Sequence, residues 1–124
     1  MTIQFRLSDD ARLFEVRYVG PLDYAMRTRA VEAAQRRLKD GWVKQILIDF
    51  SDAWPVEPAD PEQVEQFRKT LARATYPRGA RIAFLNPPGE YDDDAIQVGR
   101  VSAHFVGRRF RDRRHALAWL RGRL

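Results

Sequence analysis

Ser51 stands where a catalytic nucleophile could stand in this sequence of 124 residues. It follows the aliphatic run 46–48 of "ILIDFS", and α/β domains build their sites in the loops that leave the carboxyl ends of buried strands. A nucleophilic serine needs a base within hydrogen-bond reach and a third group that orients the base. The spacing brings neither histidine, His104 nor His115, to Ser51, so the sequence does not indicate a Ser-His-acid enzyme.

A run of three acidic residues, Asp92, Asp93 and Asp94, has the oxygen ligands that a hard cation prefers. Acidic residues at the start of a helix also cap its free amides and complement its dipole, which explains the run without a metal. The chain has no cysteine and neither a GxxxxGK[ST] nor a GxGxxG motif. We therefore expect no metal, no cofactor and no enzyme activity.

Two loops follow the two most apolar strand candidates and form the expected binding site. The first loop holds Trp54, which fits no buried face and is expected either to cover the end of the sheet or to be an exposed recognition residue. The second loop begins with Asn86. The residues expected to bind a partner or ligand are Ser51, Asp52, Trp54, Asn86 and Pro87.

Hydrophobic periodicity predicts the elements that would position these loops. Alternation predicts an antiparallel hairpin of strands 3–7 and 13–20, which Gly20 and Pro21 should end. Two runs that are apolar on both faces, 44–50 and 80–86, predict central strands, and 108–112 predicts a short edge strand. The alternation of these strands with helices predicts the order β-β-α-β-α-β-α-β-α in one α/β domain, residues 1–124.

The predicted helices are read from apolar faces and capping residues. The apolar face of the first helix consists of Leu22, Met26, Ala30, Ala33, Ala34 and Leu38. The second helix is capped by Asp60, and its apolar face consists of Val64, Phe67, Leu71 and Ala74. The third has Ala95, Val98, Ser102 and Phe105 on one face, and the last, capped by Asp112, has Ala116, Leu117, Leu120 and Leu124.

The net charge of +5 is concentrated at the carboxyl terminus. Residues 108–124 carry seven arginines and one acid, a net +6, so the rest of the chain sums to −1. The arginines expected to attract an anionic partner are Arg108, Arg109, Arg111, Arg113 and Arg114. The 19 arginines and 3 lysines also fit a skew of genome base composition, so nucleic acid is not the favoured partner.

Three stretches stand out beside the predicted order of elements: "FEVRYVGPLDYAMRTRAVEAA", "ILIDFSDAW" and "FRDRRHALAWL". Together they resemble the SpoIIAA-like branch of the STAS superfamily, small domains related to bacterial anti-sigma-factor antagonists, and the likeness runs from Ile3 to Leu120. The resemblance implies a SpoIIAA-like mixed sheet with an N-terminal antiparallel hairpin, and a non-enzymatic module that binds a protein partner and regulates it.

The chain departs from the antagonists at their phosphorylated serine. In the family that serine belongs to an Asp-Ser-Ser-Gly motif at a helix start, whereas "AWPVEPADPEQ" contains no serine or threonine. Ser51 lies about ten residues too early, beside Asp49 and Asp52, whose charge would repel a phosphate. A phosphorylation switch of the family's kind is therefore not expected here.

Two other functions stay open at this point. The superfamily's likeness to SEC14-type folds implies a small apolar-ligand or lipid carrier, with a cavity lined by Phe67, Leu71, Phe84 and Phe105. The C-terminal arginines would serve an anionic partner such as nucleic acid or a membrane surface. We expect a cytoplasmic chain without a secretory signal or membrane span, and an edge strand could pair two copies into a homodimer.

Overall fold

The computed structural model describes residues 2–39, 42–77, 79–87 and 105–123. Its elements in chain order are β1 (Thr2–Leu7), β2 (Leu13–Leu22), α1 (Tyr24–Arg37), β3 (Gln45–Pro55), α2 (Pro61–Arg73), β4 (Ala80–Leu85), β5 (Phe105–Phe110) and α5 (Arg113–Leu120). The predicted order is confirmed for every element in this part of the chain. The predicted third helix, with Asp92, Asp93, Asp94 and His104, lies outside the described residues.

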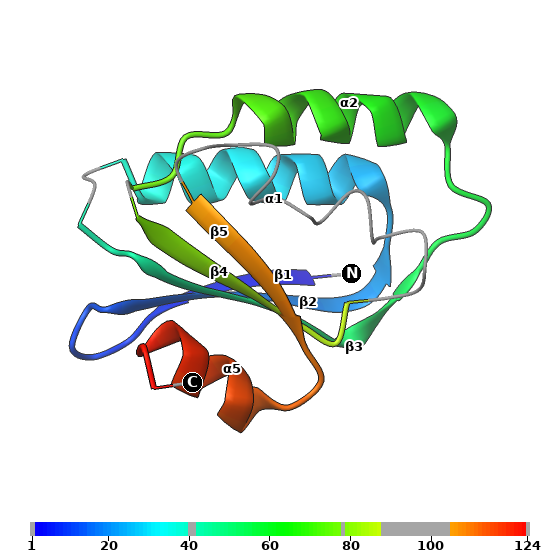
Figure 1. Ribbon diagram of the computed structural model, residues 1–124. Helices are drawn as coiled ribbons and strands as arrows, with labels where there is room; N and C mark the ends of the chain where they lie inside the picture. The colour runs from blue at the N-terminus through cyan, green and yellow to red at the C-terminus, as the bar shows by residue number, and fades with distance from the viewer. Residues whose placement is uncertain (1, 40–41, 78, 88–104, 124) are drawn as a thin grey trace.

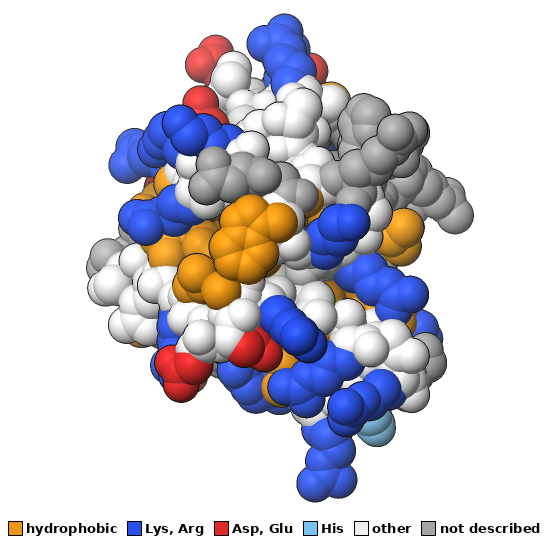
Figure 2. Space-filling view, turned by 90° about the vertical axis from the view of Figure 1, so that its left-hand side faces the viewer, with side chains coloured by type: hydrophobic (Ala, Val, Ile, Leu, Met, Phe, Trp, Pro, Cys, Tyr) orange, Lys and Arg blue, Asp and Glu red, His pale blue; other side chains and the backbone are white. Residues whose placement is uncertain are grey.

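The five strands form one mixed sheet in the order β1-β2-β3-β4-β5. β1 and β2 are the predicted antiparallel hairpin, and every later pairing is parallel. Helices α1 and α2 cover one face of the sheet and α5 covers part of the other (Figure 1). Figure 2 looks onto the end of the sheet at which the parallel strands begin.

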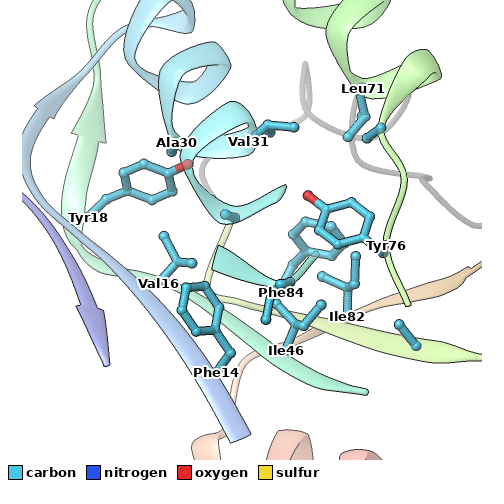
Figure 3. Close-up of a cluster of buried hydrophobic side chains, with 14 of the residues drawn as sticks. Phe14, Val16, Tyr18, Ala30, Val31, Ile46, Leu71, Tyr76, Ile82 and Phe84 are labelled. Carbon is cyan, nitrogen blue, oxygen red and sulfur yellow. The ribbon is translucent and has the colours of Figure 1, made fainter. Parts of the chain in front are cut away.

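Each face of the sheet has its own hydrophobic core. The core under α1 and α2 contains Val16, Ile46 and Ile82, together with the aromatic side chains that Figure 3 shows gathered around them. The core under α5 contains Leu47, Ala83 and Trp119. Because neighbouring residues such as Ile46 and Leu47 are both buried, β3 is covered on both faces, as its sequence predicted.

The prediction that Gly20 and Pro21 end the second strand is wrong. β2 continues to Leu22, and β3 continues through residues 51–55, which the sequence predicted as a loop. The register shifts between Arg17 and Val19, after which Gly20 pairs with Ala53 and Pro21 with Trp54. An extra residue at such a bulge lets the ladder continue, and Gly20 with φ 96° has a conformation that glycine adopts without strain.

Other boundaries move in ways that the contacts explain. Leu22 belongs to β2, and α1 begins at Tyr24 because the Asp23 carboxylate accepts a hydrogen bond from the Met26 amide at 2.8 Å. Phe105, predicted on a helix, is the first residue of β5, where it pairs with Ala80. Pairing along β4 outweighs local periodicity at that position. The caps Asp60 and Asp112 are confirmed, with acceptor distances of 2.9 and 2.7 Å.

Candidate functional site

Ser51, on β3, contacts Asn86, the residue that follows the end of β4. The Asn86 side-chain amide donates to Ser51 Oγ at 2.8 Å, and its backbone amide donates to the Phe110 carbonyl at 2.8 Å. Asn86 has φ 51°, in the left-handed region that asparagine tolerates better than most residues. Ser51 is thus held by an amide group, and no described histidine is recorded beside it.

His115 lies at a different point of the described chain. Its Nδ1 atom is 3.9 Å from Asp112 Oδ2 at the start of α5, and the ring is exposed. Among the described residues, therefore, the contacts of Ser51 supply no base that would activate it as a nucleophile.

A buried carboxylate beside Ser51 organises a network that the sequence did not predict. Asp49 is 7% exposed, and its Oδ1 accepts a hydrogen bond from the Ser51 amide at 2.8 Å. Arg113 of α5 approaches Asp49 Oδ2 at 3.7 Å and holds Glu15 of β2 through two hydrogen bonds of 2.7 and 3.1 Å. The hydrogen bond to Glu15 raises the pKa of Arg113, so this guanidinium stays charged and ties α5 to the sheet.

Asp52, next to Ser51 in the chain, forms an ion pair with an arginine of the neighbouring strand. It accepts a hydrogen bond from Arg17 of β2, which raises the pKa of Arg17 above its ordinary value. The strand register places Arg17 opposite Asp49. Glu15 and Arg17 alternate with apolar residues on β2, and this pattern is the sequence signal for the network. The signal identifies the partners only when the register between β2 and β3 is known.

Trp54 is exposed and does not cover the sheet end. Its side chain is 57% exposed, and the nearby Val56 is 45% exposed. Val56 also lines a cavity of about 240 Å³, together with Leu22, Tyr24, Arg27 and the rest of residues 55 to 59; Trp54 is not among the lining residues. Of the two placements that the sequence left open for Trp54, the structure has the exposed one, and the cavity was not predicted.

Arg27 closes the inner side of that cavity. The residue is 3% exposed, and its guanidinium lies over three aromatic rings, at 4.9 Å from the centre of Tyr24, 5.4 Å from Phe50 and 4.7 Å from Phe67. A cation over aromatic faces is stabilised by the ring quadrupoles. Its position three residues before buried Ala30, on the inner face of α1, was the sequence signal that it is buried.

The predicted arginine patch lies on β5 and the start of α5, apart from Trp54 in sequence. All five arginines are exposed. Arg113 is engaged with Glu15, and Arg108 lies 5.4 Å from the ring centre of Phe110. Phe110 and Trp119 are buried against one another with their ring centres 5.5 Å apart, so they anchor β5 and α5 to the core.

Three of the four predicted lipid-lining residues, Phe67, Leu71 and Phe84, are packed core, and the side chain of Phe105 lies outside the described part of the structure. Phe67, Leu71 and Phe84 border an internal cavity of only about 20 Å³. That is space for roughly one water molecule, whereas sites for small organic ligands hold about 300 Å³ or more. The described residues thus give no support to a lipid carrier.

The described residues form neither a metal-binding cluster nor a membrane-spanning helix. No three His, Asp or Glu side chains gather where they could hold a metal ion. No helix among them is long and apolar enough to cross a membrane.

No protein-family model matches the sequence, and neither does any curated protein. Solved structures do match. An uncharacterized DUF3478-family protein with a SpoIIAA-like fold from Shewanella loihica PV-4 is 22% identical, covering 96% of this chain and 92% of that chain, with a TM-score of 0.59. The unphosphorylated anti-sigma factor antagonist SpoIIAA is 18% identical, covering 98% and 99%, with a TM-score of 0.51. The mixed sheet, the hairpin and the helices on both faces are those of the SpoIIAA-like fold.

Proposed function

We propose that this chain is a non-enzymatic regulatory module that binds a protein partner through the carboxyl end of its sheet. The binding surface consists of Ser51, Asp52, Trp54, Asn86 and Pro87. The fold supports this proposal, because one protein with this fold is described as an anti-sigma factor antagonist. Fold alone does not specify function, whereas the residues exposed on this surface determine what it can bind.

The exposure of Trp54 is the observation that carries the proposal. Tryptophan is among the residues that contribute most to the binding energy of protein interfaces. Covering a large, exposed apolar side chain with a partner removes it from water and lowers the free energy. Trp54 is held on a strand, since its neighbour Pro21 belongs to β2 and the Val56 amide donates to the Leu22 carbonyl at 3.0 Å. A partner would therefore meet a side chain that the backbone already positions.

The charge around Trp54 indicates the chemistry of the partner's facing surface. Residues 45 to 67 contain six acidic side chains and no lysine or arginine. Five of the six are exposed: Asp52, Glu57, Asp60, Glu62 and Glu65. Complementary charge steers association, so we expect basic residues on the partner around the contact with Trp54.

Trp54→Ala tests the proposal in a pull-down from a lysate of the source cells, read by quantitative mass spectrometry. Proteins that bind through the carboxyl end should be recovered with wild type and depleted by about tenfold or more with Trp54→Ala. Trp42→Ala is the matched control, because Trp42 is 58% exposed at the opposite end of the strands. Equal recovery with wild type and Trp54→Ala, or no specific protein with wild type, would sink the proposal.

The expected homodimer stays a prediction. β1 and β5 are the two edges of the sheet in the described part of the chain, and each pairs on one side only. An edge strand supplies free backbone donors and acceptors for a second chain.

A further inference from the structure

A second apolar surface lies at the end of the sheet opposite Trp54. A groove of about 340 Å³ runs between β1, the start of β2, the end of α1 and residues 42–43. Its apolar lining consists of Phe5, Leu7, Phe14, Leu38, Trp42 and Val43. On the face shown in Figure 2, hydrophobic side chains are exposed, with lysine and arginine side chains around them and acidic side chains below them.

The groove has a buried floor and an exposed rim. Phe14, Leu38 and Val43 are 4, 5 and 6% exposed, whereas Leu7 is 46% and Trp42 58% exposed. Phe14 stacks on Phe5 with ring centres 5.8 Å apart, so the floor is fixed by packing. A concave surface with a fixed apolar floor accepts an inserted side chain, as binding pockets do.

The charged residues that line the groove are both positive, while the exposed Asp9 and Asp10 lie in the hairpin turn nearby. Arg6 and Arg37 line it, and the Arg37 guanidinium lies 4.5 Å from the ring centre of Phe5. Arg36, Lys39 and Lys44 are exposed in the adjoining sequence. In the nearby hairpin turn, Asp10 already accepts hydrogen bonds from Ser8 Oγ at 2.7 Å and the Arg12 amide at 3.1 Å. An occupant with negative charge would complement this rim.

The groove continues along an open edge of the sheet. Among the described strands β1 pairs only with β2, so its outer edge offers backbone groups to another strand. An extended peptide that adds to such an edge gains main-chain hydrogen bonds and places alternate side chains into neighbouring pockets. A flat lipid surface would use neither the concave floor nor the free edge, which favours a peptide over a membrane.

We propose that this groove binds an extended acidic segment of a partner protein, which pairs with the outer edge of β1 and inserts an apolar side chain between Leu7 and Trp42. The carboxylates of the segment meet Arg6 and Arg37. This surface is separate from the one proposed for Trp54, so the module would hold two protein segments of opposite charge at its two ends.

Selection from a displayed library of random peptides, about 12 residues long, tests the proposal with the full chain. Peptides retained by wild type and not by Trp42→Ala should combine alternating apolar residues with Asp or Glu. A labelled peptide from that set should bind at least about tenfold more weakly to Trp42→Ala and to Arg37→Glu. Trp54→Ala, altered at the other end, and Arg29→Glu, altered on the exposed side of α1, should bind it as wild type does.

Several results would overturn the proposal. Selected peptides that are basic or neutral would show that the groove does not bind an acidic segment. Peptides that bind Trp42→Ala as tightly as wild type, or a selection that enriches no peptide, would contradict the proposal equally. Binding to vesicles of phosphatidylglycerol and phosphatidylcholine that Trp42→Ala abolishes, without peptide binding, would assign the groove to a membrane. Sedimentation that shows an oligomer lost in Trp42→Ala would assign it to a second copy of this chain. Circular dichroism melts of each variant separate these results from misfolding.

Discussion

At the scale of single residues, two tyrosines place phenol groups inside the larger core. Tyr18 is 3% and Tyr76 7% exposed, and both hydroxyl groups lie among apolar side chains in Figure 3. Burial disfavours the charged phenolate, so it raises the pKa of Tyr18 to about 12 and that of Tyr76 further still. The charge of Arg27 acts on Tyr18 in the opposite direction and is the smaller effect.

These tyrosines predict a loss of stability at high pH. Above the ordinary tyrosine pKa of 10.0 the unfolded chain releases a proton that folded Tyr18 keeps until about 12, so the free energy of unfolding falls across that interval and is fully retained below it. Between about pH 9 and pH 11, wild type should lose roughly 1 kcal/mol more than Tyr18→Phe, which keeps the ring. Urea unfolding at the two pH values measures this difference. Equal losses in both proteins would contradict the assignment to Tyr18.

Asp49 shows how one residue links the candidate site to the fold. Its buried carboxylate serves the Ser51 amide on one oxygen and faces Arg113 on the other. Without these partners, the burial of its charge would be unfavourable. The residue predicted as a member of an anion-binding patch, Arg113, therefore has a second role inside this chain that its place in an arginine-rich sequence did not reveal.

At the scale of elements, sequence patterns that act locally gave correct predictions. Asp60 and Asp112 were read as caps from residue type and position alone, and both accept the expected amide hydrogen bond. The doubly buried pattern of β3 and β4 is equally reliable, because a strand covered on both faces places apolar residues on both of them. Such features depend on residues close together in sequence.

The predictions that failed depend on partners far away in sequence. Gly20 and Pro21 favour a strand end, yet β2 continues because residues 52–55 of β3 pair with it across a bulge. The same pairing turns the predicted loop around Trp54 into a strand. The meeting of Ser51 with Asn86 followed from adjacent parallel strands, whereas the pairs of Arg17 and Arg113 required register and the position of α5.

The cap of α5 allows a prediction at this scale. α5 has only eight residues, and the hydrogen bond from the Arg114 amide to Asp112 satisfies one of the roughly four amides that a helix leaves free at its start. Asp112→Ala should lower the free energy of unfolding by about 1 kcal/mol, and Asp112→Asn, which caps equally well, by much less. Chemical denaturation of the three proteins is the measurement. Asparagine and alanine variants of equal stability would show that the cap contributes little.

At the scale of the whole molecule, the two exposed tryptophans have different charged neighbours. Five exposed acidic residues lie close to Trp54 in the chain, with Arg17 and Arg113 paired to acids at the same end of the sheet, whereas the groove that Trp42 lines has Arg6 and Arg37. One exposed tryptophan stands at each end. The small net charge of residues 1–107 conceals this polarity, because opposite charges cancel in a sum and not in space.

The two cores should nevertheless unfold together. β3 supplies Ile46 to one core and Leu47 to the other, so neither can lose its strand without disrupting its counterpart. Leu47→Ala should cost about 2 to 5 kcal/mol, because Leu47 is 0% exposed, while Val106→Ala, at a site 57% exposed, should cost less than about 0.5 kcal/mol.

Cooperativity is measured with two probes in a background that carries Trp42→Phe and Trp54→Phe. The emission of Trp119 then reports the layer of α5, and far-UV circular dichroism reports mainly the longer helices α1 and α2. Both signals should change at one urea concentration, and Leu47→Ala should lower that concentration equally for both. A change of Trp119 emission at a lower urea concentration than the circular dichroism signal would show that α5 and its core unfold separately. The strand β3, which contributes to both cores, would then not couple the two faces of the sheet.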